Sequence, residues 1–344
     1  MNKFLLLSFS CLLLNTCIEN QLIDDSISPG RRDYSWELDS LSNITPNHYV
    51  DILGSSSSNV WLVTDGWNVD ENVLHFDGNN WEPVLTVPHL VAASSIFGLS
   101  QNQVWIGGRY SDFWKFNGTT FEFYGEYLPV GYLRTIITDI WGYTTNNLYA
   151  AGTTSNLTND TLFSIIMHFD GNNWEYLMGP ERVGQFTRIH TIPNSSLFYL
   201  ISINSNLPGS DLYELLETDG QDVNVLYSNA NNPSDLPWME ILGDKIFFAW
   251  EKKLYHKNNN IVSLYKDFSS TNVDHNKFYG RNTKDIFFKG YDGIVHYNGS
   301  DTELIYPIDK NFAIIDAVLF GKEVFFLLIF QNDASYYVLR GYLN

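Results

Sequence analysis

Residues 140–175 read IWGYTTNNLYAAGTTSNLTNDTLFSIIMHFDGNNWE and contain the recurring motifs of one structural repeat. Short runs of apolar, β-branched and aromatic residues alternate with polar stretches, which predicts short strands joined by turns. Asp170-Gly171 suits a tight hairpin turn, because both residue types tolerate a positive φ. Another strand begins at Trp174, so the stretch predicts four consecutive strands with short connections.

The same unit recurs along the chain. An apolar pair followed by Gly marks six copies: Ile52–Gly54, Ile96–Gly98, Ile140–Gly142, Ile241–Gly243, Phe278–Gly280 and Leu319–Gly321. A degenerate copy, Thr191-Ile192-Pro193, makes the seventh. Hairpin turns recur at Asp77-Gly78, Asn117-Gly118, Asp170-Gly171 and Asn298-Gly299. The mean period is about 44.5 residues, the length of a four-stranded propeller blade.

The last copy starts near Phe312 and has only three strands before the sequence ends at Asn344. The missing strand is found at the other end, where Trp36-Glu37 matches Trp81-Glu82. We therefore expect the N-terminal segment to complete the last blade, which removes an exposed sheet edge. The predicted fold is an all-β, seven-bladed β-propeller of four-stranded blades over residues 33–344.

Residues 33–344 resemble bacterial surface propellers with repeats of the form IWG…HFDGNNW, and are more distantly similar to kelch propellers. Gly107-Gly108 followed by Trp114 carries the kelch likeness. The resemblance implies a propeller whose motifs specify architecture rather than chemistry. Propellers of this kind include binding modules, scaffolds, hydrolases and lyases.

The N-terminus has the pattern of an export signal. Lys3 precedes an apolar run from Phe4 to Leu14, and Leu14-Asn15-Thr16-Cys17 resembles a bacterial lipoprotein signal. The resemblance implies a signal peptide over residues 1–16 and lipidation at Cys17; plain secretion and a retained membrane helix are the alternatives. Residues 17–32 are polar and predict a flexible tether. The protein is therefore expected to be exported and lipid-anchored to the bacterial envelope, at the outer membrane or cell surface.

The formal net charge is -19. An acidic surface repels nucleic-acid phosphates, which argues against nucleic-acid binding and favours cationic partners or metal ions. A simply solvated acidic surface explains the same number. The only cysteines, Cys11 and Cys17, precede the repeats, so the folded part has no disulfide and no Cys–metal site.

Acidic residues recur just before the Gly signature on the inner strands. Asp51, Asp139 and Glu240 occupy this slot, and His190 and Lys277 fill it in other blades. Because inner strands surround the channel, the three carboxyls could form an acid/base pair for glycan cleavage. Strand side chains also project toward neighbouring blades, which favours hydrogen bonds between blades instead.

The repeated histidines and one oxygen-rich loop are the other potential metal ligands. His75, His168 and His296, with His256 in the same slot, lie on different blades and cannot converge on one metal ion. The oxygen-rich residues 65–71 lack the spacing of a calcium loop. No cofactor or metal is therefore expected.

Aromatic and Arg residues outside the repeat slots could form a binding patch on the loop-rich face: Trp67, Tyr110, Tyr132, Arg134, Arg182 and Trp238.

The sequence thus favours a non-enzymatic surface propeller that binds protein or glycan through its loop face, with the lipid anchor as its sole membrane contact. The alternative is a glycan-active hydrolase or lyase that uses carboxylates at the channel mouth. A structural subunit of an envelope assembly is a third possibility.

Overall fold

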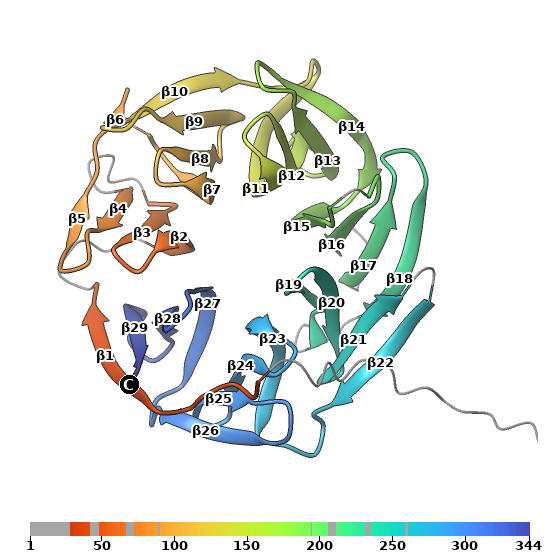
Figure 1. The fold of residues 1–344 in the computed structure, drawn as a ribbon. Helices are drawn as coiled ribbons and strands as arrows, with labels where there is room; N and C mark the ends of the chain where they lie inside the picture. Colours follow the sequence, from red (N-terminus) through yellow and green to blue (C-terminus); the bar gives the residue numbers. More distant parts are fainter. Residues whose placement is uncertain are drawn as a thin grey trace, which may run out of the picture.

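The structure is a computed structural model. It describes residues 28–41, 48–66, 72–88, 90–193, 195–205, 211–230, 235–258 and 261–344. Within these ranges the strands form seven sheets arranged in a ring, which confirms the predicted all-β, seven-bladed propeller (Figure 1). No helix in the same ranges has the length and apolar character to cross a membrane.

Each blade is a meander whose first strand lies nearest the centre of the ring (Figure 1). Blades 1 to 3 comprise β2 (Tyr49–Ser56), β3 (Asn59–Thr64), β4 (Val73–Phe76) and β5 (Trp81–Pro83); β7 (Ala93–Ser100), β8 (Gln103–Gly108), β9 (Asp112–Phe116) and β10 (Phe121–Glu126); and β11 (Tyr132–Thr144), β12 (Asn147–Asn156), β13 (Leu162–Phe169) and β14 (Trp174–Val183). Blade 2 also carries β6 (Thr86–Val87), which pairs parallel to β10.

The remaining blades follow the same order. Blades 4 to 7 comprise β15 (Gln185–Thr191), β16 (Phe198–Asn204), β17 (Leu212–Thr218) and β18 (Val223–Ala230); β19 (Trp238–Leu242), β20 (Lys245–Trp250), β21 (Lys253–Asn258) and β22 (Ile261–Asp267); β23 (Val273–Asn282), β24 (Asp285–Gly290), β25 (Gly293–Tyr297) and β26 (Thr302–Pro307); and β27 (Phe312–Leu319), β28 (Glu323–Phe330), β29 (Ser335–Leu343) and β1 (Tyr34–Ser40).

The predicted ring closure is confirmed. β1 pairs antiparallel with β29, with Tyr34 opposite Leu343 and Ser40 opposite Tyr337. The first strand therefore becomes the outermost strand of the last blade, beside blade 1 (Figure 1). This pairing leaves neither terminal strand as an open edge of the ring.

The hydrophobic core lies between the blades. Each of seven apolar clusters is built from two neighbouring blades; the cluster of blades 7 and 1, for example, joins Phe325 and Leu327 to Ile52 and Leu62. Second strands contribute most, because they are buried on both faces, as in β3. A single blade could not bury these faces, so stability depends on the complete stack.

The predicted Asp-Gly turns have the expected geometry. Gly78 and Gly171 adopt φ values of 103° and 102°. Asp77 Oδ1 accepts hydrogen bonds from the backbone N–H groups of Asn79 and Asn80 at 2.7 and 2.9 Å. A further copy of this turn, Asp219-Gly220, is not among the four predicted turns and lies between β17 and β18.

Residues 28–33 lie along blade 6. Gly30 N–H donates to the Lys284 carbonyl at 2.8 Å, and a side chain at residue 30 would come within 2.6 Å of that oxygen. Arg32 donates to the Asp301 carbonyl at 2.7 Å and to the Glu303 carboxylate at 2.8 Å. The end of the predicted tether is therefore docked, whereas residues 1–27, including Cys17, lie outside the described residues.

Candidate binding site in the central channel

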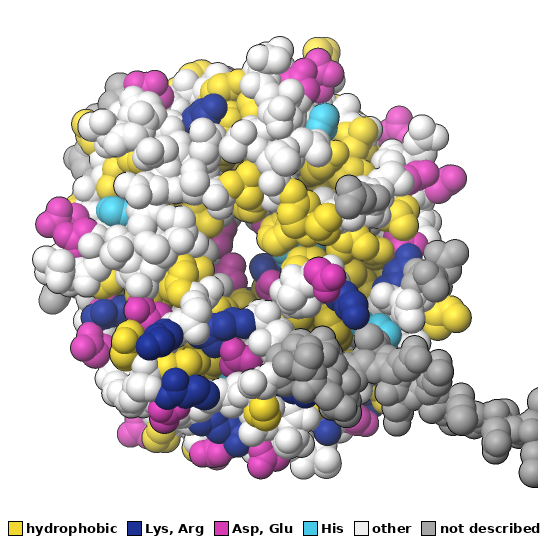
Figure 2. Space-filling model, in the orientation of Figure 1, with side chains coloured by type: hydrophobic (Ala, Val, Ile, Leu, Met, Phe, Trp, Pro, Cys, Tyr) yellow, Lys and Arg dark blue, Asp and Glu magenta, His cyan; other side chains and the backbone are white. Residues whose placement is uncertain are grey.

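The inner strands enclose a cavity of about 760 Å³ at the centre of the ring. All seven blades contribute to it, through β2, β7, β11, β15, β19, β23 and β27. The opening is visible in Figure 2, with acidic side chains inside and hydrophobic ones along part of its rim. The cavity is large enough to receive a side chain or a short segment of another molecule.

Bulges in the inner strands aim polar side chains at this cavity. In five blades the pairing with the second strand shifts register immediately before one residue: Asp51, Ser95, Asp139, Arg188 and Asp316. Four of these residues line the cavity, whereas Ser95 is buried and donates to the Ile137 carbonyl of blade 3 at 2.9 Å. A bulge places two residues opposite one, and so re-aims the side chain that follows. The equivalent blade 4 residue is therefore Arg188, two residues before the predicted His190.

Asp51 and Asp139 hold neighbouring blades together. Asp51 Oδ2 accepts a hydrogen bond from Ile96 N–H of blade 2 at 2.8 Å, while its Oδ1 accepts from Ile52 N–H. Asp139 repeats this contact two interfaces further on, between blades 3 and 4, where Ile189 N–H of blade 4 donates to its Oδ2 at 2.8 Å. The expectation that these carboxyls link blades is confirmed, and little of either is free for acid/base chemistry.

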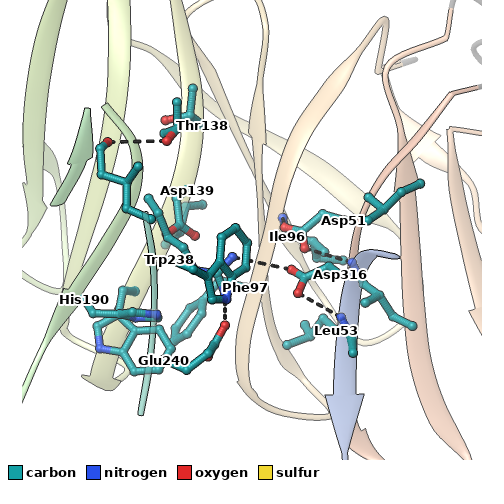
Figure 3. Close-up of a pocket in the computed structure, with 18 of the residues that line it drawn as sticks. Asp51, Leu53, Ile96, Phe97, Thr138, Asp139, His190, Trp238, Glu240 and Asp316 are labelled. Carbon is teal, nitrogen blue, oxygen red and sulfur yellow. Dashed lines mark hydrogen bonds and ion pairs between the residues drawn. The ribbon is translucent and has the colours of Figure 1, made fainter. Parts of the chain in front are cut away.

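Arg188 connects acidic groups within the channel. Its Nη2 donates to Glu240 Oε1 at 2.5 Å, and its Nη1 lies 3.8 Å from Asp316 Oδ2. The guanidinium carbon also lies 4.2 Å from the centre of the Trp238 ring. Figure 3 shows the two acids on opposite sides of the cavity, so the arginine links groups of blades 5 and 7.

Lys277 is the second cation of the channel. Its Nζ lies 4.5 Å from the centre of the Trp238 ring and donates to the Ile315 carbonyl at 3.0 Å. Burial lowers the pKa of its ammonium group to about 8, and the carboxylate of Asp316 opposes that shift. Lys277 therefore bridges blades 6 and 7 rather than facing the channel as a free charge.

Burial shifts the titration of the channel acids upward. It raises the pKa of Asp139 and of Glu240 to about 7 each, against the opposing effect of Arg188. Burial, followed by the nearby Asp316 carboxyl, holds the pKa of Asp51 well above its usual range. Around neutral pH Asp139 and Glu240 are therefore each partly protonated, and small changes in their surroundings shift that balance.

His190 lies deeper in the wall than its predicted slot implied. It is 2% exposed, and its ring packs 4.1 Å from that of Trp141. Neither ring nitrogen has a hydrogen-bond partner among the described residues. Burial and then Arg188 hold the pKa of His190 well below its usual range, so the ring is neutral; the Met239 backbone opposes the shift without reaching bonding geometry.

Trp238 is not a loop residue, contrary to the sequence expectation. It begins the inner strand β19, and its indole N–H donates to the Phe278 carbonyl of blade 6 at 3.2 Å. It packs against three of the interblade clusters. With two cations over its ring, Trp238 belongs to the channel wall rather than to an open stacking surface.

The other predicted binding residues that the structure describes lie around one rim of blades 2 and 3. Tyr110, in the β8–β9 connection, is 41% exposed. Tyr132 begins β11 and donates from its hydroxyl to the Pro180 carbonyl at 3.2 Å, with Arg134 two residues further on. Arg182, near the end of β14, pairs with Glu214 at 2.6 Å. Trp67 lies outside the described residues.

The repeated histidines have a local role. His75 and His168 bond Asn59 and Asn147 of their own blades at 2.6 and 2.7 Å, and His296 bonds Asp285 in the same way. His256 shares this slot by strand pairing. Among the described residues no three His, Cys, Asp or Glu side chains are arranged to hold a metal ion.

Of the oxygen-rich residues 65–71, the structure describes only the first two. Asp65 forms an ion pair with Arg109 at 2.6 Å. The last five residues of this stretch lie outside the described ranges.

No protein-family model matches the sequence, and no curated protein matches it. Solved structures are similar in fold. YCF48 bound to a D1 peptide covers 92% of this chain and 100% of that one, at 15% identity and a TM-score of 0.58. YCF48 from Cyanidioschyzon merolae covers 90% and 98%, at 14% and 0.55. An oligogalacturonate lyase in complex with manganese covers 92% and 99%, at 7% and 0.55. These identities are low, so the likeness shows the fold alone: this chain folds as a seven-bladed propeller.

Proposed function

We propose that the protein is a non-enzymatic binding propeller that holds a segment of a partner protein at its central channel. The observation that carries the proposal is that carboxyls of the channel wall join the blades while the cavity between them stays open. Asp51 and Asp139 are used to join blades, whereas a cavity of about 760 Å³ between them is left open. A rigid ring with an open, mixed polar and aromatic centre suits recognition better than turnover.

A protein segment is favoured over a glycan for two reasons. Sugar binding relies on exposed aromatic faces, and the Trp238 ring is already covered by Arg188 and Lys277. In addition, a solved propeller of similar fold carries a peptide. The exposed rim around Tyr110 and Leu133 would extend contact beyond the channel.

We also propose that the protein is exported and anchored through Cys17, as the lipoprotein-like residues 14–17 indicate. Anchoring would hold the ring near a membrane surface while leaving the channel accessible to partners. No contact of the ring itself with lipid is required by this proposal.

A selection of displayed random peptides on the intact protein tests the binding function. Selected peptides should lose binding when Thr187→Trp narrows the channel, because Thr187 lines the cavity. They should keep it when Leu304→Trp adds the same ring to the outer strand β26, where Leu304 is exposed. Equal binding to both variants would place the site elsewhere, and a selection that yields no binder would contradict peptide recognition.

The hydrolase or lyase function is the second candidate. Asp139 and Glu240, each with a pKa of about 7, favour it, because a general acid or base works best near the ambient pH. Incubation with a panel of acidic and neutral polysaccharides, followed by a reducing-end assay, tests this candidate. Cleavage that disappears in Glu240→Gln would replace the binding function with an enzymatic one.

A further inference from the structure

The cavity contains more acid than base. Among the described residues that line it are four carboxyls, Asp51, Asp139, Glu240 and Asp316, but only two strongly basic side chains. Burial disfavours the ionised form of Asp51, Asp139 and Glu240, so a cation that enters the channel would favour loss of their protons and pair with the negative charge that develops. The net charge of -19 over the whole chain also attracts cations at longer range.

Neither basic side chain is available to a ligand. Arg188 is engaged by Glu240, Asp316 and the Trp238 ring. Lys277 donates to backbone carbonyls of blade 7 and lies over the same ring. An anionic ligand would have to break these contacts, so the arrangement disfavours an anion.

His190 offers an unused acceptor beside the acids. Its neutral ring has one nitrogen lone pair, and neither nitrogen is bonded to a described residue. A buried polar group without a partner is costly, and a ligand that donates a hydrogen bond to it removes that cost. Figure 3 shows His190 on the same side of the cavity as Asp139 and Glu240.

Apolar and aromatic side chains complete the wall. Phe97 and Trp141 lie 5.9 Å apart between ring centres, and Ile140 and Ile201 also line the cavity. Aromatic faces attract cations, and aliphatic surface accommodates the carbon stem of a long basic side chain. The wall therefore fits a charged nitrogen carried on an apolar stem.

We propose that the channel binds a Lys or Arg side chain of the partner segment, with the excess carboxylates and His190 receiving its N–H groups. The proposal rests on the proposed function, since it names the anchor of the segment that the propeller holds. It commits the channel to a cationic side chain rather than to an acidic or purely apolar one.

Titration of the intact protein with three small probes tests this inference directly. Nα-acetyl-lysine amide and Nα-acetyl-arginine amide carry the cation, while Nα-acetyl-norleucine amide has a stem without the charge. Binding is followed by the shift of the His190 ring signals in NMR spectra, assigned with His190→Gln. The cationic probes should bind about tenfold or more tightly than norleucine amide, as expected for charge-assisted hydrogen bonds.

Matched variants locate the effect. Asp139→Asn should reduce the preference for the cationic probes several-fold, because the amide cannot ionise beside a bound cation, while its oxygen can still accept from Ile189 N–H. Asp244→Asn makes the same substitution at an exposed turn and should leave the preference intact. Both variants are compared with wild type by melting temperature, so that a folding defect is recognised.

The outcomes separate the two proposals. Equal affinity for lysine and norleucine amides, or a preference that survives in Asp139→Asn, overturns the cationic anchor. Tighter binding of free spermidine than of either amino-acid amide overturns its assignment to a protein side chain. If peptides selected on the channel bind through neutral or acidic residues, the binding function stands and only this inference fails.

Discussion

Trp36 of β1 lies directly opposite Gly341 of β29, and its six-membered ring fills the space that a side chain at residue 341 would need. A Cβ built on Gly341 would come within 2.5 Å of Trp36 Cζ3. The same ring packs 5.3 Å from Tyr306 of blade 6. The strand that closes the propeller therefore also provides an aromatic contact between its last two blades.

This contact predicts that Gly341→Ala destabilises the protein. The added methyl group must displace Trp36 from its packing, which should lower the free energy of unfolding by about 1–3 kcal/mol in urea titrations. Gly321→Ala is the matched control, because a Cβ there meets nothing within 4 Å. Equal stability of the two variants would show that the Trp36 contact is not part of the closure.

Trp238→Ala should destabilise the ring rather than only weaken ligand binding. Trp238 joins three clusters and bonds blade 6, so its loss should lower the free energy of unfolding by about 2–4 kcal/mol. Tyr110→Ala, at an exposed rim position, should change stability by less than about 0.5 kcal/mol. An unchanged melting temperature for Trp238→Ala would contradict this structural role and support the sequence prediction that Trp238 contacts a ligand.

Asp139→Asn should reduce the pH dependence of stability. Because burial raises the pKa of Asp139 to about 7, the folded protein retains a proton there between about pH 4 and 7 that the unfolded chain releases. That stabilising contribution is complete below about pH 4 and is lost as the pH rises through 7. Between pH 5 and 8, wild type should lose about 1–3 kcal/mol more stability than the variant.

The difference between the two proteins isolates Asp139, since they share the other titratable groups around the channel. These are Asp51, Tyr143, Arg188, His190, Glu240, His275, Lys277, Tyr279 and Asp316. His190 alone would give the opposite slope below its usual pKa, because it is buried in the neutral form. Parallel stability curves for wild type and Asp139→Asn would contradict a raised pKa at this residue.

Replacing Cys17 by Ser tests the anchor. If residues 14–17 direct lipidation, the variant should leave the membrane fraction of cells or accumulate unprocessed, and the mass of the wild-type protein should include the lipid. Cys11→Ser is the control within the same segment. Unchanged fractionation and mass in Cys17→Ser would contradict lipidation.

The repeat spacing was sufficient to predict the blades, but not all of the channel. The repeat motif aligns the blades on the Gly near the first turn, which lies three residues after Asp51 and Asp139. In blade 7 the bulge at Asp316 lies five residues before Gly321. Asp316 is thus two residues further from the Gly than Asp51 and Asp139 are. Side chains two residues apart in a strand lie on the same face, so Asp316 still enters the channel although the motif does not include it.

The same two-residue difference explains why the channel residue of blade 4 was predicted at the wrong position. Arg188 lies five residues before Pro193 and occupies the channel position that the pattern assigned to His190. Sequence spacing measures distance from the turn, whereas the channel position is set by the bulge. The placement of Trp238 failed for a related reason: it lies outside the repeat slots, yet it begins an inner strand.

The pairing of β1 with β29 sets the order of events during synthesis. Glu37 and Arg340 bond across this pair although they are 303 residues apart in sequence. β1 emerges first from the ribosome and has to wait for β29 before it gains a partner, so the slow, long-range step comes last. A truncated chain would keep an unpaired edge and an uncovered face on blade 1, so chaperones and proteases could distinguish an unfinished ring from a finished one.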